Sequence, residues 1–417
     1  MNTLSKDTPL FAEVDGKYGI YTLKELYELH NQGHKIRVPT LLNERGEKTW
    51  VEVEDVVNFG KQKLKRITLA TSRLFVEVSE NAIIPAYSNA LFLGIKKQIY
   101  LKFKLINVLN VSQDPRYNNT LLLTTRIPLN LPEGNNEEWE VGFTLGFFVS
   151  EGNLVYRKRS FTKNSLIRLK ALSKKKGLSL EEYLKYMTDI ERVELSVGQS
   201  DFERGYIAIL QKHFKFTIPH KVTENGYIIH SFDLSLIHLI KDHIDGSISR
   251  TKHLKNEAYN RSWKMLEGIM DGYLCGDGSY YKKGDLFQVG MTANYKLRDD
   301  LIFLSKALGY DIHLHNGYFA KSPSTNNYYY YYFRLNIFKN WHRRTALGLV
   351  KEHIKKIEDV GEREAFNLVL KPIYSENDKR AIFNHLYFTA YGFLVSDAVK
   401  TLDRSVLSSS LPVPLSS

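Results

Sequence analysis

Two segments of the chain repeat one pattern of glycine and carboxylate residues. They are Val141–Tyr156 (VGFTLGFFVSEGNLVY) and Leu266–Tyr281 (LEGIMDGYLCGDGSYY). In each segment the second glycine lies four positions after the first, and an acid lies five positions after the second glycine. A third glycine follows the acid directly. These positions hold Gly142, Gly146, Glu151 and Gly152 in the first segment and Gly268, Gly272, Asp277 and Gly278 in the second. Because carboxylate oxygens are ligands that Mg²⁺ prefers, two acids in matching positions indicate a divalent-cation site.

The paired glycines predict how the helices that carry these segments pack. Glycine at positions i and i+4 removes side chains from one stripe, so two such helices can approach closely. Each glycine costs a helix about 1 kcal/mol relative to alanine, and close packing would offset that cost. Gly152 and Gly278 are predicted to end the helices in the left-handed backbone conformation. Parallel packing would bring Glu151 and Asp277 together at one end.

The predicted position of the acids is electrostatically unfavourable without a cation. The C-terminal end of a helix carries partial negative charge, and a divalent cation would reverse the sign of the interaction. We therefore predict a Mg²⁺ or Mn²⁺ site that comprises Glu151, Asp277, Gly152 and Gly278, completed by water and phosphate oxygens. In the alternative interpretation, both segments are glycine-rich core helices whose last polar residue is merely solvated. Two copies with one spacing favour the metal site.

Similar stretches follow the two segments. Val193–Phe214 and Phe287–Tyr310 are each predicted to form a strand, a turn and an amphipathic helix. Between the first segment and its following strand, Ser165–Met187 is predicted to form two helices broken at Gly177. Ser179 and Glu182 match a capping box for the second of them, and the basic run at 174–176 slightly favours DNA contact over decoration.

The two ends of the chain are predicted to be rich in short strands. Residues 1–125 contain several β-branched stretches, interrupted by one helix at about Leu23–Gln32 that Gly33 closes. Asn130–Trp139 combines proline, glycine and asparagine and is predicted to be a linker. Ala381–Asp397 is again strand-rich.

The net charge, the single cysteine and the lack of long apolar runs limit the kinds of partner and compartment that we expect. The chain of 417 residues has a formal charge of +12, which suits a polyanion such as nucleic acid but also fits a basic surface that binds nothing. Cys275 is the only cysteine, so no internal disulfide is possible and a reducing, intracellular compartment is expected. The sequence shows no signal peptide and no apolar run long enough for a membrane span, so no membrane partner is expected.

The two glycine–acid segments resemble the paired motifs of the LAGLIDADG homing endonucleases, in particular the two-repeat type found inside inteins. The resemblance covers about 136–350. It implies a monomer with two pseudo-symmetric αββαββα halves, whose paired strands form a saddle in the major groove of DNA. It also implies metal-dependent cleavage of both strands of double-stranded DNA at a long specific target, with Glu151 and Asp277 as catalytic metal ligands.

The same resemblance suggests one lysine in each half. Lys221 and Lys321 begin matching regions, and family members often place a lysine there to polarise water or stabilise charge on the phosphate. A solvated loop lysine is the more common identity of any single lysine in a basic protein. The tyrosine run 328–332 would alternate between the two faces of a strand, with most of the rings used in packing.

The flanking segments resemble the first and last sequence blocks of an intein, which implies an all-β Hint domain with the endonuclease inserted. The residues that splicing needs are changed. Thr3 stands at the position of the first nucleophile, and the usual Thr-x-x-His pair is replaced by Ser79 and Ala82. The terminal His-Asn pair is replaced by Ser396 and Asp397, and Ala398 follows where a nucleophile is required. We therefore predict that splicing activity is lost.

Together these observations predict an α+β chain of several parts. Its expected divisions are a Hint-like part at 1–125, a linker at 126–139, an endonuclease domain at 140–360, a second Hint-like part at 365–397 and a disordered tail at 398–417. Two other functions stay open: a DNA-binding regulator that no longer cuts, and a protein-splicing element. The expected location is cytoplasmic or nucleoid-associated, in a host cell if a phage encodes the protein.

Overall fold

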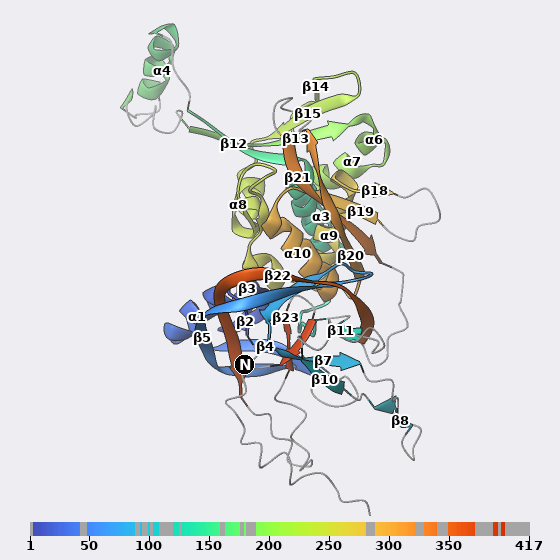
Figure 1. The fold of residues 1–417 in the computed structure, drawn as a ribbon. Helices are drawn as coiled ribbons and strands as arrows, with labels where there is room; N and C mark the ends of the chain where they lie inside the picture. Colours follow the sequence, from blue (N-terminus) through green and yellow to red (C-terminus); the bar gives the residue numbers. More distant parts are fainter. Residues whose placement is uncertain are drawn as a thin grey trace, which may run out of the picture. The chain divides into compact units, whose positions relative to one another are not determined.

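The structure is a computed structural model (Figure 1). It describes residues 3–41, 48–87, 92–93, 99–100, 103–107, 120–124, 127–158, 163–175, 179–180, 189–280, 288–321, 329–339, 349–371, 387–390 and 393–396. The chain divides into two compact units. The first holds Met1–Asn130, Leu301–Asn316 and Arg334–Ser417, and the second holds Leu131–Asp300 and Gly317–Phe333. Mixed helices and antiparallel sheets confirm the coarse α+β expectation.

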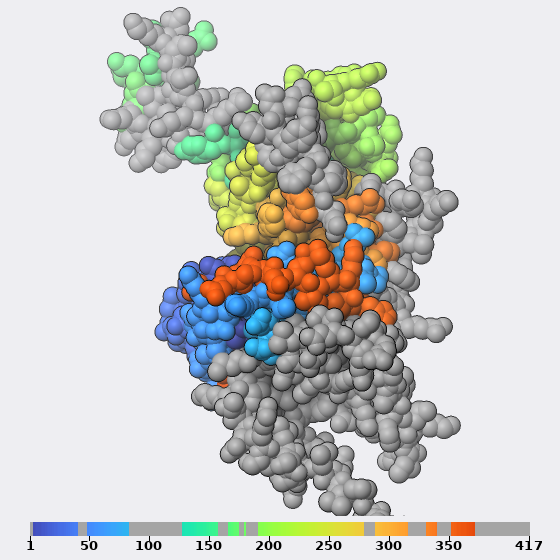
Figure 2. Space-filling model, in the orientation of Figure 1, coloured from blue at the N-terminus to red at the C-terminus, as the bar shows by residue number. Residues whose placement is uncertain are grey.

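The first unit is built almost wholly of strands. Its elements are β1 (Leu4–Ser5), β2 (Pro9–Val14), β3 (Lys17–Thr22), α1 (Leu23–Asn31), β4 (Ile36–Leu41), β5 (Lys48–Leu69), β6 (Phe75–Ser79), β7 (Ile83–Tyr87), β8 (Phe92–Leu93), β9 (Ile99–Tyr100), β10 (Phe103–Asn107), β11 (Thr120–Thr124), β22 (Leu349–Leu370), β23 (Tyr387–Ala390) and β24 (Phe393–Ser396). The two long strands β5 and β22 pair antiparallel and run side by side across one face of the unit (Figure 2). Strands β23 and β24 form a hairpin within the predicted strand-rich segment.

Helix α1 shows why the first predicted helix forms where it does. Thr22 and Glu25 make a reciprocal capping box, in which Thr22 Oγ1 accepts from the Glu25 N–H at 3.2 Å and Glu25 Oε2 accepts from the Thr22 N–H at 2.7 Å. Gly33 follows with φ of +87°, a left-handed conformation that glycine adopts without strain. The prediction of this helix and its glycine stop is confirmed.

The second unit alternates helices with short antiparallel sheets. Its elements are α3 (Asn136–Glu151), β12 (Gly152–Lys158), α4 (Lys163–Lys175), β13 (Asp189–Gly198), α6 (Gln199–Glu203), α7 (Tyr206–His213), β14 (His220–Lys221), β15 (Gly226–Ser231), α8 (Leu234–His243), β16 (Ile244–Asp245), β17 (His253–Leu254), the 3₁₀ helix η1 (Asn256–Asn260), α9 (Trp263–Gly276), β18 (Ser279–Tyr280) and β19 (Gln288–Thr292). Three further elements, α10 (Tyr295–Ala307), β20 (Asp311–Lys321) and β21 (Tyr329–Phe338), contribute residues to both units.

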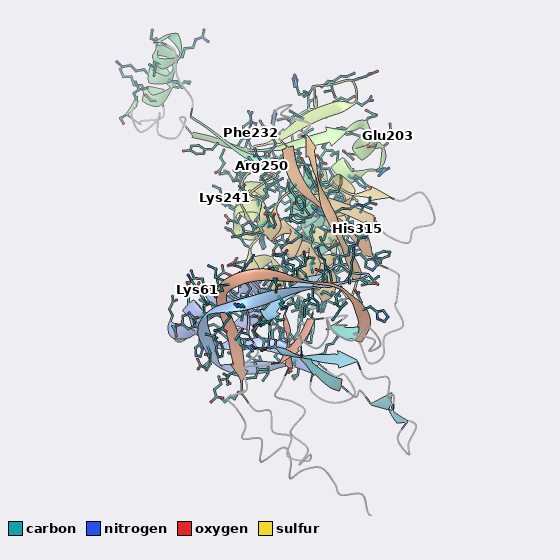
Figure 3. All side chains as sticks on the ribbon, viewed as in Figure 1. Lys61, Glu203, Phe232, Lys241, Arg250 and His315 are labelled. Atoms are coloured by element: carbon teal, nitrogen blue, oxygen red, sulfur yellow. The ribbon has the colours of Figure 1, made fainter. Side chains whose placement is uncertain are left out.

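Two four-stranded sheets accompany these helices. Their strand orders are β12-β13-β15-β14 and β18-β19-β21-β20. One face of the first sheet belongs to the core, because Val193, Leu195 and Val197 of β13 are all buried. Lys241 on α8 reaches back to Glu191 of β13 at 2.6 Å, which ties that helix to the sheet (Figure 3).

The stretches after the two repeated segments fold as predicted. Strand β13 leads into α6 and α7, and strand β19 leads into α10. Helix α4 matches the first of the two helices expected at Ser165–Met187, whereas Gly177 and Glu182 lie outside the described residues. Tyr328 lies outside them too, and the rest of the tyrosine run begins β21. Among the described helices, none is both long enough and apolar enough to cross a bilayer.

Candidate metal centre

Helices α3 and α9 pack at their glycines. A Cβ atom added to Gly142 would lie 2.2 Å from the carbonyl oxygen of Met265, and one added to Gly146 would lie 2.0 Å from that of Ile269. In α9 the relation is reciprocal: the added Cβ atoms of Gly268 and Gly272 would lie 2.1 and 2.0 Å from the carbonyl oxygens of Trp139 and Phe143. Real Cβ contacts are never this short, so only glycine permits this approach. Higher residue numbers in one helix meet higher numbers in the other, so the helices run parallel.

Parallel packing brings the ends of both helices to one place. A Cβ atom added to Gly276, the last residue of α9, would lie 2.0 Å from Ser150 Oγ and 2.9 Å from Glu151 Cγ. Glu151 is the last residue of α3, and Asp277 caps α9 with φ of −80° and ψ of −1°. The structure therefore brings Glu151 and Asp277 to the same end of the helix pair.

The helices begin at asparagine and serine caps that the repeated pattern does not contain. Helix α3 starts at Asn136 within the predicted linker, because Asn135 and Glu138 form a capping box with bonds of 2.9 and 3.0 Å. Helix α9 starts at Trp263, where Ser262 Oγ accepts from the Met265 N–H at 3.2 Å. The predicted linker at Asn130–Trp139 is thus too long at its C-terminal side.

The predicted conformation of Gly152 and Gly278 is wrong. Gly152 has φ of −94° and ψ of 157°, and Gly278 is not among the residues with positive φ. The chain passes from each helix directly into a strand, which requires extended rather than left-handed backbone. Glycine is needed here for space: an added Cβ would lie 2.2 Å from the Phe148 ring at Gly152 and 1.9 Å from the Leu274 carbonyl oxygen at Gly278.

Both acids hold their protons unusually well in the metal-free protein. Burial raises the pKa of Glu151 from 4.5 to about 7, with a further increase from the nearby charge of Asp201 and an opposing effect from Lys252. Burial also raises the pKa of Asp277 from 3.8 to about 7, followed by repulsion from Glu151. Glu151 is half-buried. Asp277 as a whole residue is exposed, but the protein atoms around its carboxylate take away enough hydration to raise its pKa. A cation between them would relieve both the burial cost and the repulsion.

Lys252 lies beside the two acids, and the sequence did not single it out. Its side chain is completely buried, and its Nζ donates to the carbonyl oxygen of Phe148 at 2.7 Å and to that of Gly152. It therefore occupies the C-terminal end of α3, where it contacts the Phe148 carbonyl oxygen, which also accepts from the Gly152 N–H, and the carbonyl oxygen of the capping residue Gly152. Burial lowers the pKa of Lys252 to about 8, while Asp277 and Glu151 raise it. No local signal separates this lysine from Arg250 and Lys255 in the same stretch.

Of the two lysines predicted from the sequence, the structure places the side chain of Lys221 only. Lys221 is exposed on β14 and pairs opposite Tyr227, three strands away from β12, which corresponds to about 14 Å at the usual strand spacing. Lys321 is the last residue of β20, and its side chain lies outside the described residues. The structure thus groups Glu151, Asp277 and Lys252 and leaves Lys221 on a sheet edge.

The raised pKa of Glu151 yields a stability prediction for the metal-free protein. Its proton is held more tightly in the folded chain, so the stabilisation is complete below pH 4.5 and is lost as the pH rises through about 7. At pH 8 the folded protein must bury a carboxylate, and Glu151→Gln is expected to increase the free energy of unfolding by about 2 kcal/mol. At pH 4.5 the two proteins should be equally stable.

Urea unfolding in EDTA at both pH values measures this difference. The control is Glu203→Gln, which neutralises an exposed carboxylate of the same unit (Figure 3) and should change stability little at either pH. A Glu151→Gln protein that is less stable than wild type at pH 8 would contradict the prediction.

Comparison of the sequence with protein-family models and with curated proteins finds no match. Comparison of the fold finds partial likeness to solved structures. Mesophilic variants of the homing endonuclease I-DmoI share 12% identity over 49% of this chain and 90% of theirs, with a TM-score of 0.32. I-DmoI in complex with DNA and Ca shares 13% over 49% and 84%, also with a TM-score of 0.32. An intein from a hyperthermophile shares 22% over 30% and 73%, with a TM-score of 0.24.

Proposed function

We propose that this chain is a metal-dependent endonuclease that hydrolyses both strands of double-stranded DNA at a long specific site. The observation that carries the proposal is the group formed by Glu151, Asp277 and Lys252. Two repeated segments deliver one carboxylate each to the common end of a glycine-packed helix pair, and a buried ammonium group lies beside them. Perturbed acids grouped with a cationic side chain are typical of catalytic sites.

The carboxylates would act as ligands for Mg²⁺ or Mn²⁺. Among the described residues no group of three or more acidic, histidine or cysteine side chains is placed so that it could hold a metal ion by itself, so water and DNA phosphate oxygens would complete the ligand set. Bound cations of this kind activate water for attack and stabilise the departing oxygen. Asp201, whose Oδ2 accepts from the Gly198 N–H at 2.7 Å, adds negative charge near Glu151 and strengthens the attraction for a cation.

Lys252 would contribute a fixed positive charge. Two of its three N–H donors are used by the carbonyl groups of Phe148 in α3 and of Gly152 directly after it, which leaves one for an acceptor near the acids. An ammonium group in that place stabilises the charge that develops on a phosphate during hydrolysis. Lys321 remains a proposal for the catalytic lysine of the second half, whereas for Lys221, on the edge strand β14, we now propose a contact to the DNA backbone in place of the catalytic role.

The sheet β12-β13-β15-β14 supplies a surface suited to DNA. Its core face carries Val193, Leu195 and Val197, so its other face carries the alternate residues Arg192, Glu194 and Ser196. We propose that this face enters the major groove and that the matching order of elements after α3 and after α9 reflects two pseudo-symmetric halves of a monomer.

The proposed activity is tested with the DNA that surrounds the protein's own gene, in occupied and unoccupied forms. Metal-dependent cleavage at one site in Mg²⁺, with none in EDTA, is the expected result. Lys252→Met is expected to slow single-turnover cleavage by about a hundredfold, because a fixed charge near the phosphate is removed. Specific binding without cleavage in Mg²⁺ would contradict the proposal and favour the non-cleaving regulator.

Helix α4 is proposed to extend the DNA contact. Its sequence, KNSLIRLKALSKK, has five basic residues and no acid. Arg168, Lys170 and Lys174 are all exposed. Replacing these three by glutamine is expected to weaken DNA binding and to make its logarithmic salt dependence shallower by about 2 to 3, because each phosphate contact contributes roughly 0.9 to the slope.

Binding measured between low and moderate salt tests this contribution of α4. The control replaces three exposed lysines of the first unit by glutamine, Lys24, Lys61 and Lys63, and so has the same net charge as the α4 variant. Lys61 is labelled in Figure 3. If the control changes the slope as much as the α4 variant does, net charge alone explains the effect and the α4 contact is refuted.

For the first unit we propose a scaffold that does not splice. The Thr3 N–H donates to Ser79 Oγ at 3.3 Å, and Ala82 is buried where the expected histidine would be needed. Ser396 ends β24, whereas Asp397 and Ala398 lie outside the described residues. A full-length product without spliced or cleaved species on expression is the result this proposal predicts.

A further inference from the structure

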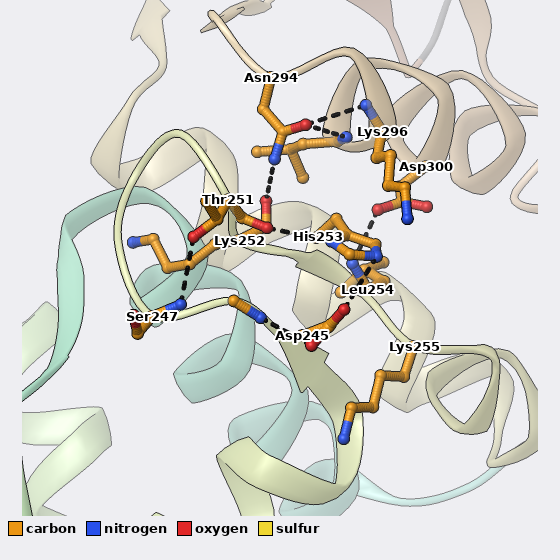
Figure 4. A network of polar contacts seen from close by, with 12 residues as sticks. Asp245, Ser247, Thr251, Lys252, His253, Leu254, Lys255, Asn294, Lys296 and Asp300 are labelled. Atoms are coloured by element: carbon orange, nitrogen blue, oxygen red, sulfur yellow. Dashed lines mark hydrogen bonds and ion pairs between the residues drawn. The ribbon is translucent and has the colours of Figure 1, made fainter.

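Lys252 is held in place through its backbone by a separate helix. The segment that carries it runs from the turn at 246–251 into β17, and two buried side chains of the α10 region bind the backbone of this segment at Lys252 and at Leu254 (Figure 4). Asn294 Nδ2 donates to the Lys252 carbonyl oxygen at 2.7 Å, and Asp300 Oδ2 accepts from the Leu254 N–H at 2.7 Å. We name Asn294 and Asp300 the α10 clamp.

Asn294 also caps the start of α10. Its Oδ1 accepts from the Lys296 N–H at 2.9 Å, so the side chain caps the helix while its amide group binds Lys252. Its own N–H donates to Thr292 Oγ1 at 3.0 Å, at the end of β19. Because both ends of the carboxamide are bonded, its orientation is fixed.

Asp300 is equally constrained. Its Oδ1 accepts from Tyr259 Oη at 3.3 Å, and both residues are buried. On the other side of Lys252, the turn is closed by the Lys252 N–H, which donates to the Ile248 carbonyl oxygen at 2.9 Å. The Lys252 N–H, the Lys252 carbonyl group and the Leu254 N–H are thus each held by a hydrogen bond, the first within the turn and the other two to buried side chains.

We infer that Asn294 is a positioning residue that keeps the Lys252 ammonium group buried against the end of α3 and beside Glu151 and Asp277. The side chain of Lys252 is long and flexible, and its burial is opposed by the loss of hydration. If only the ammonium group of Lys252 were held, the backbone around Lys252 could shift and move the ammonium group out of its buried position. The bond from Asn294 to the Lys252 carbonyl group prevents this withdrawal. This inference rests on the proposed function only where it concerns cleavage, since the burial of Lys252 can be measured directly.

The test uses Asn294→Ser in the full-length protein. Serine keeps the cap of α10 but removes the amide donor to Lys252. Asn294→Asp is the second variant: it keeps the size and the cap and places an acceptor opposite the Lys252 carbonyl oxygen. The matched control is Asn135→Ser, which changes an asparagine cap of α3 at the opposite end from the acids.

The first readout is the rate at which reductive methylation modifies Lys252, measured by mass spectrometry and normalised to the exposed Lys221. The clamp predicts modification at least about fivefold faster in both Asn294 variants than in wild type, because local opening exposes a buried group. The second readout separates catalysis from binding. Single-turnover cleavage should slow by at least about tenfold while DNA affinity stays within about twofold.

The two readouts fail in different ways. If wild type does not cleave DNA but Lys252 is modified faster in the variants, the positioning role of Asn294 is supported and the proposed function is contradicted. If wild type cleaves but Lys252 is modified at the wild-type rate in both Asn294 variants, the positioning role is overturned. The same holds if Asn135→Ser accelerates the modification equally, because the effect would then reflect a general loss of helix capping.

Discussion

Replacement of Asp277 by asparagine is expected to lower the single-turnover rate of DNA cleavage in Mg²⁺ by at least about a thousandfold. Asparagine has nearly the same size and can cap α9 as Asp277 does, so the fold should be retained. What is lost is one of the two negative charges that would bind the proposed cation. A divalent cation is attracted by two carboxylates much more strongly than by one, so Glu151 alone would give a much weaker site.

Asp242→Asn is the control for this prediction. Asp242 is an exposed acid near the C-terminal end of α8, and the same substitution there should leave the rate unchanged. DNA affinity in Ca²⁺, measured for all three proteins, shows whether binding survives. An Asp277→Asn protein that cleaves at a rate near that of wild type would remove this residue from the catalytic site.

Replacement of Gly272 by alanine is expected to destabilise the second unit by more than about 3 kcal/mol. The new Cβ atom would lie 2.0 Å from the Phe143 carbonyl oxygen and 2.8 Å from the Phe147 nitrogen, so two helix backbones must separate. In an ordinary helix the same change would stabilise by about 1 kcal/mol, because alanine is the better helix former. The sign of the effect therefore reports the packing of α3 against α9.

Gly198→Ala provides the matched comparison. Gly198 has φ of −93°, and an added Cβ would meet nothing closer than 3.6 Å, so this variant should be about as stable as wild type. Urea unfolding measures both proteins. Equal stability of Gly272→Ala and Gly198→Ala would contradict the close parallel packing. A loss confined to Gly272→Ala would also separate the acids, so cleavage should fall with it.

The helix pair and its two acids could be predicted from the sequence because the information is local. Spacing within one helix fixes which residues share a stripe, and glycine has no other common reason to recur there. The position of Glu151 and Asp277 follows from that stripe. The conformation of Gly152 and Gly278 could not be predicted in this way, because it depends on whether a turn or a strand follows the helix.

The position of Lys252 beside the two acids could not be predicted from the sequence. Its place beside the acids is set by the turn before it and by Asn294 and Asp300, which come from a helix more than forty residues later. No spacing rule links these positions. Matching regions of the two halves indicate Lys221 instead, and the structure places Lys221 on the edge strand β14. Tertiary contacts, which no window of sequence contains, decide which lysine meets the carboxylates.

The most direct test of the central claim, that Glu151 and Asp277 form a metal-dependent DNA-cleaving centre, works without a defined target sequence. Wild type and the double variant Glu151→Gln, Asp277→Asn are incubated with genomic DNA of the source organism and with a randomised library, in Mg²⁺ or in EDTA, and all new DNA ends are sequenced. Recurrent ends produced only by wild type in Mg²⁺ are predicted. Identical recurrent ends from the double variant, or none from folded wild type, would contradict the account.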